Sequence, residues 1–353
     1  MKDYGTPLIG TDTMFHITSK MRRMLMLCSL LIAVMAVLVT AQYAKGMLSP
    51  AAVPDGASTP VEWRSVVKYK DVLNPHMEGT PFVWKDKLYY FVSERGDTPA
   101  SLRLSIYDFT TRQRIALFAE HQQLLLGSAF VDGNTFYAFV TKNHTEYGKS
   151  QIYMIQSKDL RSFSKPLLIY HAPEKQQIFN TSVTRNSDTG EYVMAFETTT
   201  KGELTPFTVY FLKSKDIVRW ALVDGVVFGK DMYVASPTLK YLDKWYYLWF
   251  LMKEYNDPNC PNCTTYVTKI ARSKDLSTWQ TSPHFFMVPD RSDEGINVSD
   301  VDLTEFNNRV YILYAVGDQD KWTNMRLAVY DGTLRSLVQN FFPKEASSSA
   351  SGK

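Results

Sequence analysis

The chain has 353 residues, of which 45% are apolar and 14% aromatic, so it can bury a large core. Its formal net charge of +3 is too small to indicate a nucleic-acid partner. The 21 tyrosines favour strands over helices, and all-β propellers reach this length as a single domain.

The N-terminal region predicts a secretory signal or a membrane anchor. Residues 1–23 are polar and basic, and residues 24–41 form an apolar run that ends in Val-Thr-Ala. The pattern fits a signal peptide cleaved at the end of this run, if translation begins at Met21, or an uncleaved type II anchor. Both alternatives place the rest of the chain in the secretory lumen or outside the cell. Residues 42–60, which include a Pro/Gly/Ala/Ser stretch, form a linker.

The cysteines and glycosylation sequons agree with an oxidising compartment. Cys260 and Cys263 enclose a Cys-Pro-Asn-Cys loop, for which we expect a small disulfide. A redox site would need a helix after the first cysteine, where the sequence instead reads as a strand, and no second Cys/His pair supports a metal site. Four sequons predict glycosylation, with the first as the preferred acceptor: Asn143, Asn180, Asn262 and Asn297.

A turn motif recurs with a period near 50–60 residues. Its clearest copies read Ser-Lys-Asp-Leu/Ile-x-x-Trp/Phe, and the acid of the motif recurs in five copies: Asp108, Asp159, Asp216, Asp275 and Asp331. We interpret the Asp as capping backbone N–H groups between a third and a fourth strand, with the aromatic residue packing on the next strand. The number of copies therefore indicates the number of structural units, and the residues of the motif are structural and not catalytic.

A second repeat supports this count, because each unit begins with an apolar strand, a tight turn and a Tyr-rich strand. The five hairpins lie at residues 80–91, 128–139, 182–196, 236–250 and 297–319. Together the repeats predict an all-β fold, a five-bladed β-propeller over residues 61–343. A strand at Val61–Tyr69 is left over and could pair with the last blade. We expect the tail at residues 344–353 to be disordered.

The last hairpin is unusual because it gathers carboxylates. Asp300 and Asp302 are two residues apart and so lie on one side of the first strand, with Glu305 and Asp318 nearby. We interpret this hairpin as the wall of a polar site. The alternative is a solvated strand end.

The Asp turns and the x-Pro-x-Val…Tyr-Tyr-x-Phe hairpins resemble the arabinanase/levansucrase/invertase superfamily, the five-bladed glycoside hydrolases of families 32, 43 and 130. The resemblance implies that acids at the starts of the inner strands face an axial pocket and act as general acid, general base or nucleophile. By position, the first blade offers Glu78 where relatives usually have Asp. The third blade offers Asn180 where an Asp is expected, and the fourth offers Ser236 where a Glu precedes Pro237.

The sequence therefore predicts Glu78, Asp300 and Asp302 as catalytic residues that face one another across the pocket. One would be protonated as the general acid and another ionised as the base or nucleophile. The expected sugar-binding groups are His76, Glu197, Asp318, Gln319, Asp320 and Trp322. No cofactor is expected, and a structural calcium ion on the propeller axis is left open.

The expected function is a monomeric glycoside hydrolase with an oligosaccharide or glycan substrate, membrane-bound only through an uncleaved N-terminal segment. A secreted or anchored propeller that binds a glycan or a protein without cleaving it is the alternative, favoured by the missing acids of the third and fourth blades. A type II glycosyltransferase is disfavoured because the chain shows no alternation of strands and helices.

Overall fold

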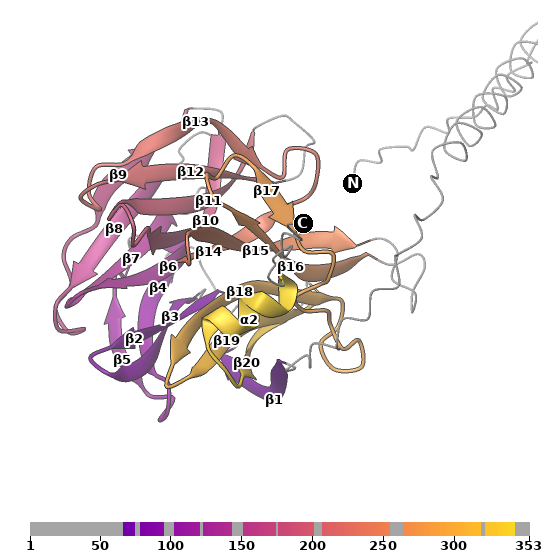
Figure 1. Ribbon diagram of the computed structural model, residues 1–353. Coiled ribbons are helices and arrows are strands. Elements are labelled where there is room, and N and C mark those ends of the chain that lie inside the picture. Colours follow the sequence, from indigo (N-terminus) through magenta and orange to yellow (C-terminus); the bar gives the residue numbers. More distant parts are fainter. Residues whose placement is uncertain are drawn as a thin grey trace, which may run out of the picture. The chain divides into compact units, whose positions relative to one another are not determined.

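The computed structural model describes residues 66–74, 78–94, 102–120, 123–142, 151–173, 176–200, 207–254, 264–318 and 322–342. Within these ranges the chain forms twenty strands and one short helix, so the predicted all-β fold is confirmed (Figure 1). The predicted signal or anchor segment, the disulfide and several site residues lie outside the described residues: residues 1–65, His76, Asn143, Cys260, Asn262, Cys263, Gln319 and Asp320. In the described part of the chain, no helix is long and apolar enough to cross a membrane.

The strands form five four-stranded antiparallel units, here called blades 1 to 5. Blade 1 contains β2 (Gly79–Trp84), β3 (Lys87–Glu94), β4 (Arg103–Asp108) and β5 (Arg114–Phe118). Blade 2 contains β6 (Leu124–Asp132), β7 (Thr135–Lys142), β8 (Gln151–Ser157) and β9 (Leu167–His171). Blade 3 contains β10 (Gln176–Arg185), β11 (Tyr192–Thr200), β12 (Thr208–Ser214) and β13 (Ala221–Phe228).

The last two blades are joined by a single parallel bridge between Tyr266 and Asn297. Blade 4 contains β14 (Ala235–Leu242), β15 (Trp245–Glu254), β16 (Thr265–Ser273) and β17 (Trp279–Thr281). Blade 5 contains β18 (Asn297–Phe306), β19 (Arg309–Gly317), β20 (Thr323–Tyr330) and, from the other end of the described chain, β1 (Val67–Asn74). The five predicted hairpins are confirmed, since each forms the first two strands of one blade.

The first strands of the blades surround a common axis. In the order β2, β6, β10, β14 and β18 each contacts the next, and β18 contacts β2. The sheets remain separate at most of these junctions and meet through side chains, which the alternating apolar pattern of the strands supplies.

The predicted leftover strand does pair with the last blade, although it lies further along the chain. β1 is antiparallel to β20 and supplies the fourth strand of blade 5. The fourth strand expected after Asp331 is replaced by the helix α2 (Leu334–Phe341). Thr333 begins this helix because its side chain accepts a hydrogen bond from Ser336 N, and the apolar face of the helix packs onto the core.

The Asp turns behave as predicted in four blades. The Oδ1 atoms of Asp108, Asp159, Asp216 and Asp275 each accept hydrogen bonds from the backbone N–H groups two and three residues further on. Asp331 differs, because its carboxylate forms an ion pair with Arg309 at 3.0 Å. In the last blade the helix N-terminus therefore replaces the capped turn.

Candidate functional site

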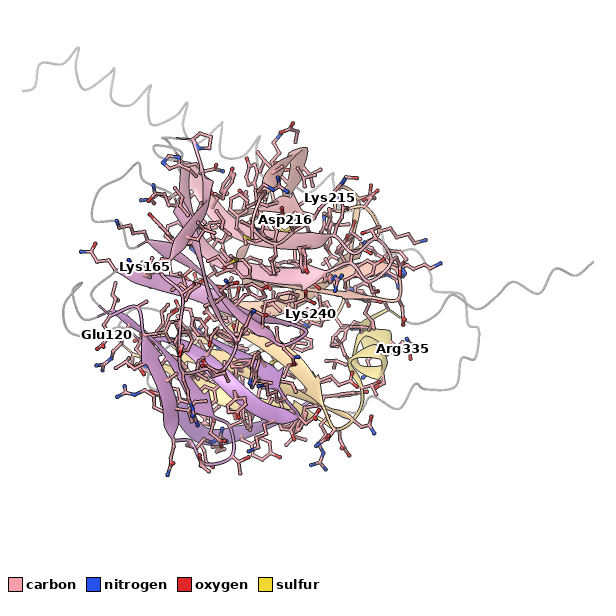
Figure 2. The ribbon with its side chains drawn as sticks, turned by 90° about the vertical axis from the view of Figure 1, so that its left-hand side faces the viewer. Glu120, Lys165, Lys215, Asp216, Lys240 and Arg335 are labelled. Atoms are coloured by element: carbon pink, nitrogen blue, oxygen red, sulfur yellow. The ribbon has the colours of Figure 1, made fainter. Side chains whose placement is uncertain are left out.

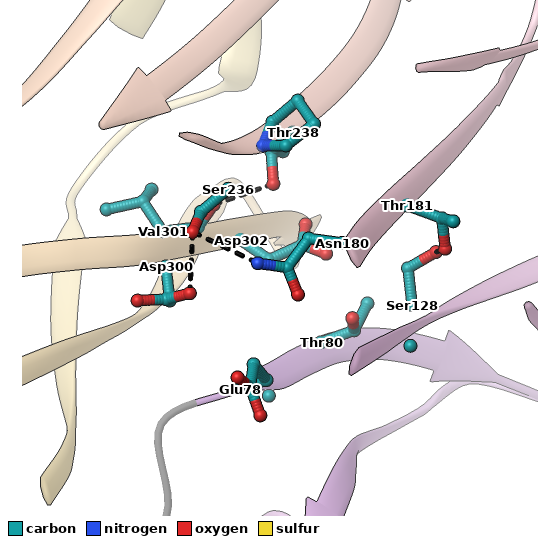
Figure 3. A pocket seen from close by; sticks show the side chains of 13 residues that line it. Glu78, Thr80, Ser128, Asn180, Thr181, Ser236, Thr238, Asp300, Val301 and Asp302 are labelled. Carbon is teal, nitrogen blue, oxygen red and sulfur yellow. Dashed lines mark hydrogen bonds between the residues drawn. The ribbon is translucent and has the colours of Figure 1, made fainter. Parts of the chain in front are cut away.

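A small polar pocket lies where the five first strands meet (Figure 3). Residues near one end of each first strand line it, so every blade contributes at least one. They include Glu78, Ser128, Asn180, Ser236, Asp300 and Asp302. The space that water can enter is about 30 Å³. One water needs roughly 10–15 Å³, so the floor of the pocket holds only a few waters. A sugar ring would have to contact these groups from the mouth.

Irregularities of the first strands aim these side chains at the axis. A β-bulge interrupts the pairing of β6, β10, β14 and β18 with their neighbours at the level of the pocket. At three of the bulges a residue other than glycine has a left-handed backbone: Leu126, Ser236 and Asp300, with φ of 53°, 47° and 50°. Such conformations cost free energy and cluster at functional sites.

The centre of the site is a hydrogen-bond network that joins three blades. Glu197 Oε2, on β11, accepts from Ser236 N at 2.8 Å and from Asn180 Nδ2 at 3.1 Å. Asn180 Nδ2 also lies 3.1 Å from Ser236 Oγ. Ser236 Oγ donates in turn to Asp300 Oδ1 at 2.7 Å, and Ser299 Oγ donates to Asp300 Oδ2. The network therefore orients both oxygens of the Asp300 carboxylate.

The surroundings of Glu197 strongly raise its pKa. Its side chain is buried behind the pocket lining. Burial, with smaller contributions from the nearby Asp300 and Glu78 carboxylates, raises its pKa to about 8, against the opposing hydrogen bonds from Ser236 and Asn180. Near pH 7 the Glu197 carboxyl group therefore keeps its proton.

Asp302 has a different electrostatic partner. Its Oδ1 accepts a hydrogen bond from Leu303 N at 2.7 Å and lies 3.0 Å from Lys240 Nζ on β14. Lys240 lies among the strands, whereas Lys165 and Arg335 point outwards from the periphery (Figure 2). The ion pair with Lys240 balances the charge of Asp302.

The other predicted site residues lie apart from the pocket lining. Asp318 Oδ1 accepts a hydrogen bond from Trp322 N at 3.0 Å, and the Trp322 side chain is 40% exposed. Asn297 is fully buried, and its Nδ2 donates to Ser299 Oγ at 3.0 Å. The Nδ2 atoms of Asn180 and Asn297 both form hydrogen bonds inside the fold, and glycosylation of these residues stays a prediction. Among the described residues, no group of three or more His, Cys, Asp or Glu side chains is arranged to hold a metal ion.

Sequence reasoning missed Lys240 and the buried state of Glu197. Beyond the bulge, the alternation of β14 places Thr238 and Lys240 on one face, which is a signal for Lys240 once the position of Thr238 is known. No comparable signal exists for Glu197, because the groups around its carboxyl lie on other strands, among them Ser236 of blade 4 and Asp300 of blade 5.

Comparisons with known proteins agree with this architecture at the level of fold. No protein-family model and no curated protein matches the sequence. Among solved structures, BT0996 in an RGII complex superposes with a TM-score of 0.56 at 12% identity, covering 76% of this chain and 91% of that one. A thermostable family-43 glycoside hydrolase gives 0.55 at 11% identity, with coverages of 72% and 89%. An exo-1,5-α-L-arabinanase from a bovine ruminal metagenomic library gives 0.51 at 10% identity, with coverages of 74% and 94%. The resemblance predicted from the repeats is thus confirmed as a shared fold: the chain has the propeller fold of the family-43 glycoside hydrolases.

Proposed function

We propose that this protein is a carbohydrate-active propeller that hydrolyses a glycosidic bond at the mouth of the axial pocket. The observation that carries the proposal is that Glu78 of blade 1 and Asp300 of blade 5 line one small polar pocket, with Glu197 of blade 3 buried behind the lining and influenced by both charges. Glycosidic hydrolysis needs one carboxyl group that carries a proton and a second that is ionised. The structural neighbours support the carbohydrate class, because they include family-43 hydrolases and an arabinanase.

Asp300 is the better candidate for the ionised group. The hydroxyls of Ser236 and Ser299 donate to its two oxygens, and hydrogen bonds of this kind stabilise the negative charge of a carboxylate. Its side chain lines the pocket, so it can reach a substrate or an attacking water. We assign it the role of base or nucleophile.

Glu78 then provides the carboxyl group that faces the leaving oxygen. It lines the pocket at the entrance to β2, in the blade next to blade 5. Glu197 acts behind the pocket as a carboxyl that holds a proton and responds to the charges of Glu78 and Asp300. Asp302, which the sequence placed in the catalytic pair, is given a supporting role because Lys240 neutralises it.

A glycan-binding propeller without catalysis is the second candidate. The observation that favours it is that Asn180 and Ser236 stand where the resemblance leads us to expect acids, and both are engaged in the network. The two candidates share the pocket and differ in whether a bond is cleaved.

The test is a screen of aryl glycosides and neutral oligosaccharides with the purified full-length chain. If the proposal holds, Asp300→Asn and Glu78→Gln each lower turnover by about two to four orders of magnitude. Asp224→Asn, which changes an exposed carboxylate on β13, is the matched control and should retain full turnover. Oligosaccharide binding with no cleavage of any substrate would favour the second candidate.

A further inference from the structure

The turn motif has a second structural role, which is to fill the outer crevice between neighbouring blades. In blades 2, 3 and 4 the aromatic residue at the end of the motif packs on the preceding blade. The ring pairs are Phe163 with Phe118 at 3.9 Å, Trp220 with Phe139 at 5.9 Å and Trp279 with Phe211 at 5.7 Å between centroids. The crevices at these three junctions are therefore closed by aromatic contact.

The junction between blade 5 and blade 1 is built differently. The turn after Asp108 is shorter, since Asp108 N donates to Gln113 O, whereas in blade 2 the corresponding bond runs from Ser164 N to Gln156 O. The aromatic residue of this turn is Phe109, whose ring packs edge-on against Tyr311 of blade 5 at 5.3 Å. Arg112 stands four residues after the Asp, where the copies in blades 2, 3 and 4 have Phe or Trp, and its guanidinium lies 4.6 Å from the centre of the Phe109 ring.

A cavity of about 450 Å³ remains outside this contact. Its walls are β1, the outer parts of β19 and β20, and the turn that carries Arg112. Alternate residues of β1, from Val67 to Leu73, face it, as one side of a strand should. The volume lies within the range of small-molecule sites, about 300–1,000 Å³, and exceeds the water-sized floor of the axial pocket.

The lining of this crevice combines aromatic rings with balanced charges. Tyr69 is 45% exposed, and Tyr311, on β19, lines the same cavity. Arg309 Nε lies 3.0 Å from Asp331 Oδ1, and the Asp71 carboxylate acts electrostatically on Arg112. Two guanidinium groups and two carboxylates leave no net charge, which disfavours phosphate-rich or strongly acidic partners. Hydroxyl groups match these donors and acceptors, and the apolar face of a sugar ring matches tyrosine and valine.

A peptide strand is a poorer fit to the same place. Addition of a peptide needs a regular row of free backbone groups along an edge strand. The pairing of β1 with β20 shifts register twice, between Lys68 and Val72 and again before Asn74. Bulges of this kind twist an edge strand and protect it from further pairing.

We propose that the crevice between blade 5 and blade 1 is a second binding site, which takes a neutral oligosaccharide. Tyr69 and Tyr311 contact the sugar faces, and Arg112, with its neighbour Asp71, binds their hydroxyls. The site is separate from the axial pocket, so it does not depend on the proposed hydrolysis.

The experiment titrates the full-length chain with neutral tetrasaccharides of arabinose, xylose, mannose and glucose and measures binding by calorimetry. All measurements use the Asp300→Asn variant as the parent protein, so that the axial pocket cannot hydrolyse the tetrasaccharide. Adding Arg112→Ala with Tyr69→Ala is expected to weaken binding of the preferred tetrasaccharide about tenfold or more. Arg219→Ala is the matched control, because Arg219 lies in the equivalent turn of blade 3, where Trp220 fills the crevice. It should leave the affinity unchanged.

Three results would overturn the proposal. The first is that the full-length chain binds none of the four probes. The second is that the double variant binds as tightly as its parent protein while both show the same thermal unfolding. The third is that only changes of the axial pocket, such as Ser236→Ala, abolish binding. Capture of a peptide that Arg112→Ala prevents, with no sugar bound, would assign the crevice to a peptide instead.

Discussion

Ser236 Oγ donates a 2.7 Å hydrogen bond to Asp300 Oδ1, and both residues have left-handed backbones, with φ of 47° and 50°. The two residues belong to neighbouring blades and are 64 positions apart. Each strained backbone turns its side chain towards the other. The strain and the hydrogen bond are therefore parts of one arrangement, which fixes the Asp300 carboxylate at the wall of the pocket.

The first prediction concerns the coupling between these two residues. Ser236→Ala should lower the free energy of unfolding by about 1 kcal/mol, because it removes a partly buried hydrogen bond. Combined with Asp300→Ala, the two changes should be non-additive by about 0.5–3 kcal/mol, as expected for residues in one network. Urea denaturation of the single and double variants measures this coupling.

Asp159 provides the control, because this turn residue of blade 2 shares no hydrogen-bond partner with Ser236. The effects of Ser236→Ala and Asp159→Ala on the free energy of unfolding should therefore be additive. If the effects were additive in the Ser236/Asp300 pair as well, Ser236 and Asp300 would not be energetically coupled.

A second prediction separates Asp302 from Asp300. Lys240→Met leaves the Asp302 carboxylate without its cation in a largely buried position, and should lower the free energy of unfolding by about 1–3 kcal/mol. The double variant Lys240→Met, Asp302→Leu should recover part of this loss, since it removes the charge as well. Thermal and chemical unfolding at one fixed pH test this. Asp302→Asn should lower the free energy of unfolding and have little effect on turnover. A loss of turnover without a loss of stability would return Asp302 to the catalytic pair.

The blades could be predicted from the sequence because their signals are local. Hairpins such as Thr80–Phe91 combine an alternating apolar pattern with a tight turn, and the Asp of each motif bonds to N–H groups two and three residues away. Both signals sit within about a dozen residues. The turn at Asp331 differs from the prediction for a local reason too, because Thr333 caps a helix there. The fourth strand of this blade is supplied by β1 instead.

The site could be predicted only in part, because its contacts join distant residues. Asp300 and Asp302 were predicted to share one side of a strand, and both do line the pocket. The bulge between Ser299 and Asp302 breaks the simple alternation, and the two carboxylates meet different partners on β14. Glu197 accepts hydrogen bonds from Asn180 and Ser236, which are 17 and 39 positions away, so no pattern near residue 197 could reveal its surroundings.

A third prediction concerns the attachment of β1 to blade 5. Glu294 is buried and accepts hydrogen bonds from Lys68 Nζ at 2.5 Å, Tyr314 Oη at 2.9 Å and Asp290 N at 2.7 Å. Lys68→Met leaves this carboxylate buried without its cation, and should lower the free energy of unfolding by about 1–3 kcal/mol. Amide hydrogen exchange should quicken along β1 before it does so in blades 2 and 3.

Lys70 provides the matched control for this prediction. It pairs with Asp293 at 3.6 Å, but its side chain is 80% exposed, so Lys70→Met should change stability by less than about 0.5 kcal/mol. Equal effects of the two substitutions would mean that burial of Glu294 does not matter for the attachment of β1.

The last prediction follows from the raised pKa of Glu197. In the unfolded chain this carboxyl titrates near its ordinary value of 4.5, whereas burial first, and then the charges of Asp300 and Glu78, raise its pKa to about 8 in the folded protein. Between these two values the folded state keeps a proton that the unfolded state has lost. The contribution of Glu197 to stability is therefore fully present below about pH 4.5 and is lost as the pH rises towards about 8.

Glu197→Gln keeps the shape of the side chain and cannot ionise. The difference in free energy of unfolding, variant minus wild type, should therefore grow by on the order of a few kcal/mol between pH 4.5 and pH 8, and then level off. Glu120→Gln, which alters an exposed carboxyl group, should give a flat difference over the same range. Urea denaturation across this pH series measures both. A flat difference for Glu197→Gln would show that the Glu197 carboxyl titrates alike in the folded and unfolded chains, and would remove it from the proposed proton-holding role.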